Sequence, residues 1–127
     1  LFVASTACGA QAAGADPAPW RALGEWLGQA YQVADDIRDV MADPQLLGKP
    51  VGQDAALGRP SVARDLGLEG AVLHFRALIG QAGDSIPECT GAAALRALVR
   101  AEAERLVPVA MTEALFRTAA EAPLAQA

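Results

Sequence analysis

Aromatic residues, histidine and cysteine are all scarce in this chain of 127 residues. Aromatic side chains make up 5% of the sequence, and there are one histidine and two cysteines. The cysteines, Cys8 and Cys89, lie far apart and lack the spacing of a metal site. We therefore expect two reduced, partly buried thiols in a cytoplasmic protein, and no disulfide.

Positive charge is limited as well, with 10 Lys and Arg residues against 15 Asp and Glu residues and a net charge of −5. A protein of this charge has no broad basic surface to neutralise phosphates, so nucleic acid is not an expected partner. To bind an anionic substrate, it would need a metal ion or a local cluster of cations. Long apolar runs are missing too, so no membrane span is predicted.

The chain is rich in alanine and other apolar residues, which together make up 53% of the sequence. Alanine has the highest helix propensity, and the apolar residues recur at helical spacing. The predicted helices cover residues 1–14, 17–42, 61–66 and 68–79, with a further helix from about residue 95. Pro108 breaks or kinks this last helix, and residues 44–60 and 80–91 are predicted loops. No strand pattern or internal repeat is found, so the fold class is predicted to be all-α, in one domain.

Three of these helices have an apolar face that predicts where they pack. An amphipathic helix needs another element to cover that face. The predicted core stripe of the second helix includes Leu23, Trp26, Leu27, Ala30, Val33, Ala34 and Ile37; Leu68, Val72, Phe75 and Ile79 share one face of the fourth helix; and Leu95, Leu98, Val99 and Leu106 mark the last.

A stripe of four polar residues interrupts this apolar pattern near the end of the second helix. Gln32, Asp35, Asp36 and Asp39 fall at i, i+3, i+4 and i+7 and therefore share one side of the helix. Aspartate is a poor residue inside a helix, neighbouring carboxylates repel each other, and the negative end of the helix dipole disfavours anions. All three effects become favourable if a divalent cation lies on the stripe. Hard oxygen ligands without nearby His or Cys indicate magnesium, which usually shares its coordination shell with substrate phosphates.

The following loop supports this interpretation. Lys49, Asp54 and Arg59 lie there among several glycines. Lysine and arginine bind diphosphate oxygens, and glycine lets backbone N–H groups approach an anion. The alternative is a solvated acidic face on which Arg38 pairs with Asp35 three residues away, and for an isolated Asp-Asp-x-x-Asp that alternative would be favoured. The cation-bearing loop shifts the balance to a diphosphate site.

These motifs resemble a known family. The run from Gly28 to Asp39 is similar to the second aspartate-rich region of trans-polyprenyl diphosphate synthases, and the segments Leu47–Asp54 and Leu57–Ser61 look like the loop that follows it. The resemblance extends from residue 1 to about residue 81 and is strongest to short-chain bacterial geranylgeranyl or farnesyl diphosphate synthases. It implies that the chain is the C-terminal part of an isoprenoid-synthase helical bundle, and that the family's homodimer contact could involve the first helix.

For the metal, the resemblance implies that Asp35 ligates magnesium directly. Asp36 and Asp39 would complete or orient its water shell. Asp54 resembles a loop aspartate that reaches the waters of the metal.

For the substrates, the resemblance implies condensation of an allylic diphosphate with isopentenyl diphosphate. Lys49 and Arg59 stand where two lysines of the family bind the allylic diphosphate. Gln32 would face the reacting allyl group, and Tyr31 occupies a position usually held by phenylalanine.

The chain also departs from the family. Arg59 replaces lysine with retention of charge, and Pro60-Ser61 replaces a polar-Thr-Pro order. The first aspartate-rich motif, the arginines beside it and the isopentenyl-binding residues are not in this chain, so we expect that it does not turn over alone. Two other interpretations stay open: a non-catalytic helical subunit or remnant that binds magnesium-diphosphate or a partner, and, less favoured because of the loop, a terpene cyclase.

Overall fold

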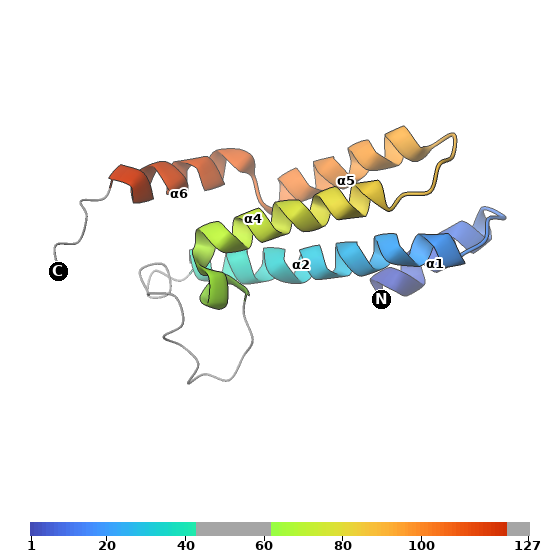
Figure 1. Cartoon of the computed structure of the whole chain (residues 1–127), viewed down its shortest axis with the longest axis horizontal. Coiled ribbons are helices and arrows are strands. Elements are labelled where there is room, and N and C mark those ends of the chain that lie inside the picture. Colours follow the sequence, from blue (N-terminus) through green and yellow to red (C-terminus); the bar gives the residue numbers. More distant parts are fainter. Residues whose placement is uncertain (43–61, 122–127) are drawn as a thin grey trace.

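The computed structural model describes residues 1–42 and 62–121, and these residues form a helical bundle without strands (Figure 1). The all-α prediction is confirmed. The elements in chain order are α1 (Phe2–Ala12), the 3₁₀ turn η1 (Ala18–Trp20), α2 (Arg21–Ala42), α4 (Val62–Asp84), α5 (Ala92–Leu106) and α6 (Val109–Glu121).

Helices α1 and α2 form a close hairpin at the N-terminal end of the chain. Gly14, with a φ of 79°, lies in the turn after α1, and an Asp16 carboxylate oxygen accepts the Ala18 N–H at 3.0 Å, as expected of a residue that caps a helix start. The two helices approach so closely that a Cβ at Gly24 would lie 2.6 Å from the Cα of Val3. A glycine is therefore required at this crossing.

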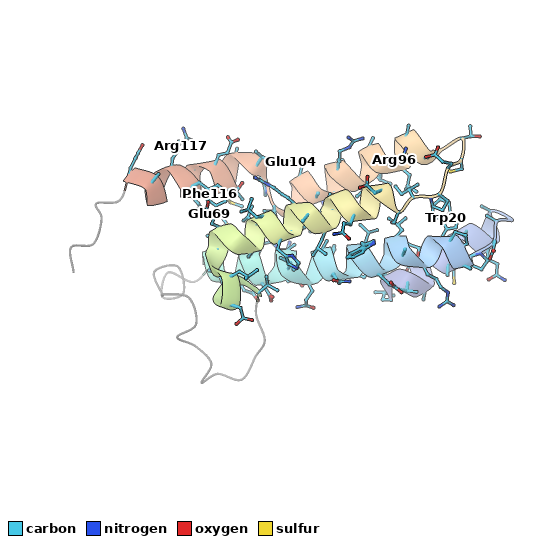
Figure 2. All side chains as sticks on the ribbon, viewed as in Figure 1. Trp20, Glu69, Arg96, Glu104, Phe116 and Arg117 are labelled. Carbon is cyan, nitrogen blue, oxygen red and sulfur yellow. The ribbon has the colours of Figure 1, made fainter. Side chains whose placement is uncertain are left out.

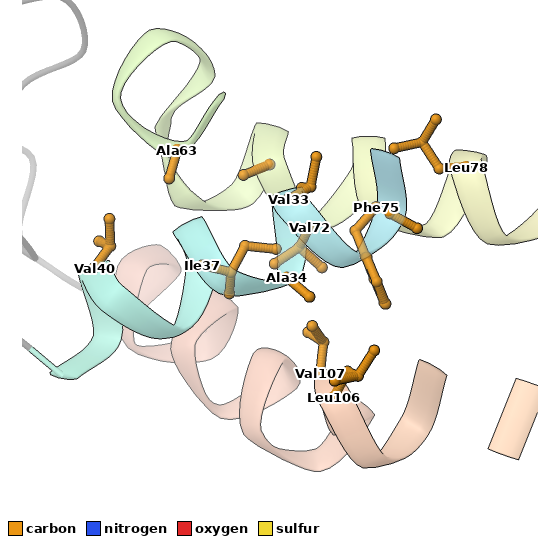
Figure 3. Packing of buried hydrophobic residues seen from close by; sticks show 12 residues of the cluster. Val33, Ala34, Ile37, Val40, Ala63, Val72, Phe75, Leu78, Leu106 and Val107 are labelled. Atoms are coloured by element: carbon orange, nitrogen blue, oxygen red, sulfur yellow. The ribbon is translucent and has the colours of Figure 1, made fainter. Parts of the chain in front are cut away.

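The centre of the bundle is the antiparallel pair α2 and α4, which lie side by side (Figure 1). Val72 of α4 and Ile37 and Ala34 of α2 have no solvent exposure, and Phe75 is 2% exposed (Figure 3). The predicted core face of α2 is confirmed: five of its members are buried, and Trp26 and Leu27 are partly buried beside them. The predicted face of α4 is confirmed as well, with Leu68 and Ile79 partly buried against the same cluster.

Gly67 divides α4 as the sequence predicts. Its φ of 74° and ψ of 170° kink the helix between the short stretch before it and the long stretch after it. A positive φ of this size is readily adopted by glycine only, so the helix changes direction here without strain.

The predicted loop over residues 80–91 is wrong in its first part, because α4 continues through Gly80 and Gly83 to Asp84. Glycine costs only about 1 kcal/mol in a helix interior. Burial of Ala82 and Ile86 in a second cluster with Leu23 and Val99 offsets that cost. Tertiary packing thus overrides the local preference.

Helix α5 runs antiparallel to α4 and meets it through Ala92, Val99 and Leu106, all buried. Leu98, one of the residues that mark this helix in the sequence, is 63% exposed. Arg96 of α5 (Figure 2) donates hydrogen bonds to the Gly83 carbonyl at 3.3 Å and to the Glu88 carboxylate at 3.1 Å. These bonds fix the segment between α4 and α5 against α5.

Pro108 separates α5 from α6, as predicted. Glu104 accepts the Val109 N–H at the start of α6, at 3.2 Å from each carboxylate oxygen. Thr112 is the anchor of α6: it is fully buried and accepts a hydrogen bond from Arg76 of α4 at 2.9 Å.

Two further expectations concern thiols and membranes. Both cysteines are free, as expected, but both are exposed, so their predicted partial burial is wrong. His74, expected at the surface or in packing, is exposed. None of the helices described here has the length and apolarity needed to cross a membrane.

Candidate functional site

The predicted polar stripe lies on the last turns of α2, on the side that the core leaves free. Gln32 and Asp39 are exposed, and Asp35 and Asp36 are partly buried. The opposite side of the same turns is fixed in the core by Val33, Ile37 and Val40. The helix therefore presents the stripe from a rigid, well-packed element, which is the placement that a binding site needs.

Asp35 and Arg38 form an ion pair across one helical turn. The Asp35 side chain is 49% exposed and that of Arg38 is 45% exposed. Solvent-exposed pairs of this kind contribute little to stability, typically below about 1 kcal/mol. The pair that belongs to the alternative interpretation, a solvated acidic face, is thus present, and its small energy leaves the Asp35 carboxylate free to exchange partners.

Asp36 has a different neighbour. Its Oδ2 accepts the backbone N–H of Val62, the first residue of α4, at 3.3 Å. This contact joins the end of α2 to the start of α4 across 26 residues of chain.

Tyr31 lies beside the stripe but turns toward α1 and α5. Its ring packs on Phe2 with ring centroids 5.2 Å apart and planes tilted by 45°. The two rings help to line a cavity of about 130 Å³ that Leu27, Ile79, Val99 and Leu106 also border. Apolar walls of this kind keep water from a reactive hydrocarbon.

The mouth of this cavity has charged groups that the sequence did not single out. Glu102 of α5 lines the cavity and pairs with Arg105. The hydrogen bond from Arg105 lowers the pKa of the Glu102 carboxyl. The pKa of Arg105 is raised, mainly by Glu102 and further by Tyr31. Only the packing of α5 shows that these charged groups adjoin Tyr31.

Lys49, Asp54 and Arg59 lie outside the described residues, so their predicted roles stay predictions. Within residues 1–42 and 62–121, no three His, Cys, Asp or Glu side chains converge closely enough to hold a metal ion by themselves. Asp35 and Asp39, one helical turn apart and both reached by solvent, supply two hard oxygen donors. Two carboxylates match the protein share of a magnesium site whose other ligands are waters and phosphate oxygens.

Comparison with known proteins identifies the family. Residues 1–86 match the family model for polyprenyl synthetase. The chain belongs to the polyprenyl synthetase family. The matched residues include α1, α2, α4 and the whole polar stripe, whereas α5 and α6 lie beyond them.

Individual polyprenyl synthetase relatives agree with this assignment. The chain is 48% identical over 108 residues to a geranylgeranyl diphosphate synthase of Cereibacter sphaeroides, and 40% identical over 109 residues to one of Rhodobacter capsulatus. These matches cover 85% and 86% of this chain but 38% of each relative. A farnesyl diphosphate synthase of Escherichia coli is 44% identical over 64 residues, half of this chain and 21% of that protein. No solved structure matches the chain.

Proposed function

We propose that this chain is the C-terminal part of a prenyltransferase that joins an allylic diphosphate to isopentenyl diphosphate, of the geranylgeranyl diphosphate synthase type. The observation that carries the proposal is the polar stripe of α2, which lies within the stretch of 48% identity to such a synthase. The chain spans about two fifths of the length of that relative, with 38% covered. The whole activity therefore requires polypeptide beyond these 127 residues.

In this reaction the bond between the allylic carbon and the diphosphate oxygen breaks, and a carbon–carbon bond forms to the alkene of isopentenyl diphosphate. The adduct then loses a proton, and the departing diphosphate is a suitable acceptor for it. Magnesium bound with the diphosphate would neutralise the charge that develops on the leaving group. Asp35 and Asp39 are the described residues that would hold it.

The other residues of the site have separate tasks in this proposal. Gln32, exposed on the same side of α2, presents its amide to the allylic end of the substrate. Tyr31 and Phe2 close the apolar cavity and keep water away from the allylic carbon. Lys49, Asp54 and Arg59, outside the described residues, would add cations for the diphosphate and a carboxylate for the waters of the metal.

A second candidate is a non-catalytic helical subunit or remnant. The observation in its favour is that two carboxylates of the stripe already have partners within the chain, Arg38 for Asp35 and Val62 for Asp36. Under this alternative the stripe stabilises the bundle and binds magnesium-diphosphate or a partner without catalysing a reaction.

A chimera separates the two candidates. The 108-residue segment of the Cereibacter sphaeroides geranylgeranyl diphosphate synthase that this chain matches is replaced by this chain. Product formation is followed with labelled isopentenyl diphosphate. The prenyltransferase proposal predicts an active chimera and no product from the 127-residue chain alone. A chimera that folds, binds magnesium-diphosphate and forms no product would support the non-catalytic candidate.

The remaining proposals concern the cellular location, the oligomeric state and the metal of the enzyme. We infer a cytoplasmic homodimer that uses magnesium, with the small residues of α1 available for a close helix contact. The molar mass of the active chimera in solution, measured by light scattering, tests the dimer: a value equal to one chain would contradict it.

A further inference from the structure

Asp35 and Asp36 are neighbours in sequence but serve different parts of the molecule. Successive residues of an α-helix are rotated by about 100° around its axis. Asp35 reaches along its own helix to Arg38, whereas Asp36 reaches across to the first residue of α4. Two side chains that diverge in this way are poorly placed to chelate one ion together.

The surroundings of Asp36 fix its direction. Ile37 and Val40 on the same turn are buried against α4, and Ala63 at the start of α4 is 5% exposed in the same cluster. Val62 packs against this cluster as well. The contact between Asp36 and the Val62 N–H is thus partly shielded from water and is supported by apolar packing on both helices.

The contact also compensates an unfavourable electrostatic interaction of Asp36. A carboxylate near the C-terminal end of α2 meets the negative end of that helix dipole. The N-terminal end of α4 has N–H groups without partners in the helix and a positive partial charge, and both favour a carboxylate. For Asp36, the start of α4 supplies the compensation that a cation would otherwise provide.

We propose that Asp36 is a positioning residue, which caps the start of α4 from α2 and so fixes the two helices relative to each other, and that it is not a direct metal ligand. The inference refines the proposed function, because it divides the aspartates of the stripe into Asp35 and Asp39 for the metal and Asp36 for the fold. Its structural part does not depend on whether the protein is a prenyltransferase.

The test uses Asp36→Asn and Asp36→Ala. Asparagine caps a helix about as well as aspartate, whereas alanine does not cap. Asparagine is a much weaker ligand than a carboxylate for a hard divalent cation. If Asp36 is a cap, its role is kept in Asp36→Asn and lost in Asp36→Ala. If Asp36 is a metal ligand, its role is lost in both variants.

Hydrogen exchange of the Val62 amide in the 127-residue chain, followed by NMR, is the first measurement. We expect the amide to be protected in the parent and in Asp36→Asn, and to exchange about fivefold faster or more in Asp36→Ala. Glu25→Gln, an exposed acid-to-amide change on the same helix, is the matched control and should leave the exchange unchanged. An unprotected Val62 amide in the parent, or equal exchange in all variants, would overturn the proposal.

Turnover of the same variants in the chimera is the second measurement. We expect Asp36→Asn to stay within about threefold of the parent chimera and Asp36→Ala to lose more. Loss of turnover in Asp36→Asn as large as in Asp35→Asn, with Val62 still protected, would make Asp36 a ligand and overturn the proposal. If the parent chimera itself is inactive, the proposed function fails, and the exchange result alone decides the role of Asp36.

Discussion

The pair α2 and α4 and the pair α5 and α6 are built differently. In the first pair, large side chains such as Ile37 and Val72 are completely buried along the length of the contact (Figure 3). In the second, α5 contributes three buried residues, and α6 is anchored through Thr112 and, partly, Phe116. Leu98, Val109 and Met111 of this second pair are between 40% and 63% exposed, and Leu66 and Leu73 of α4 are similarly exposed, so the difference between the pairs lies in their buried contacts.

The difference coincides with the limits of the family match. The polyprenyl synthetase model covers α2 and α4 and ends at residue 86, before α5 begins. The well-packed pair is also the one that presents the polar stripe. A site that must hold its side chains accurately needs rigid support, whereas helices outside the site can pack more loosely. We therefore expect perturbations of the first pair to cost far more stability than matched perturbations of the second.

The largest expected effect is from truncation of a core side chain in the first pair. Phe75→Ala should lower the free energy of unfolding by about 3–5 kcal/mol, because it leaves a cavity in the main cluster. Leu98→Ala on α5 truncates an exposed side chain, serves as the surface control and should change it by less than about 0.5 kcal/mol. Urea unfolding followed by circular dichroism measures both. Similar losses of unfolding free energy in the two variants would contradict the proposed difference between the two helix pairs.

The next effect concerns two glycines that lie in helices. Gly24→Ala should destabilise the chain by about 1–3 kcal/mol, because the new Cβ would lie 2.6 Å from the Val3 Cα and 2.7 Å from the Phe2 carbonyl oxygen. Gly80→Ala meets nothing within 4 Å and should stabilise α4 by about 0.5–1 kcal/mol. Thermal unfolding of the two variants gives the sign directly. A stabilising Gly24→Ala would mean that α1 does not pack this closely on α2.

A smaller effect is expected at the anchor of α6. Thr112→Val keeps the shape of the side chain but removes the acceptor for Arg76 and the donor to the Val109 carbonyl, so it should cost about 1 kcal/mol. The control is Thr118→Val, whose hydroxyl is exposed and bonds within its own helix. Limited proteolysis adds a local readout, because α6 should become easier to cleave in Thr112→Val only. Equal stability and equal cleavage of α6 in the two variants would show that Thr112 does not anchor α6.

The smallest effect is expected at the exposed pair of Glu102 and Arg105. The pKa of Glu102 lies below its usual value because Arg105 stabilises the carboxylate, so any stability from this pair is present above the unfolded-state pKa and is lost as the pH falls through the folded-state pKa. Arg105→Ala should return the pKa of Glu102 to its ordinary range without a measurable change in the melting temperature. NMR titration of the Glu102 side chain gives the pKa. An unchanged pKa would show that the pair does not form in solution.

Much of the packing of α2 and α4 could be predicted from the sequence. The helical spacing of the apolar residues sets both which side of α2 is buried and where its polar stripe lies. The kink at Gly67 was predicted for a similar reason, since a glycine that follows a short helix indicates a positive φ. The loop predicted over residues 80–91 was wrong in its first part, because glycine is a weak helix breaker that burial of Ala82 can override.

The polar stripe was predictable as a set of residues on one side of a helix, but the contacts of its side chains were not. Sequence spacing places Asp35, Asp36 and Asp39 near one another, but the hydrogen bond that Asp36 accepts from Val62, 26 residues later, depends on how α2 and α4 meet. The same holds for Glu102 beside Tyr31, because no local pattern reports which face of α5 adjoins α2.

The central claim is that the stripe on α2 handles the diphosphate of a prenyltransferase substrate, and turnover of the Asp35→Asn chimera tests it most directly. Glu25→Gln, which removes the same charge from the same helix, is the control. Because loss of one stabilising group at a developing charge typically lowers the rate by about 100-fold or more, we expect such a loss for Asp35→Asn and none for Glu25→Gln. Turnover of Asp35→Asn equal to that of the parent chimera would contradict the account.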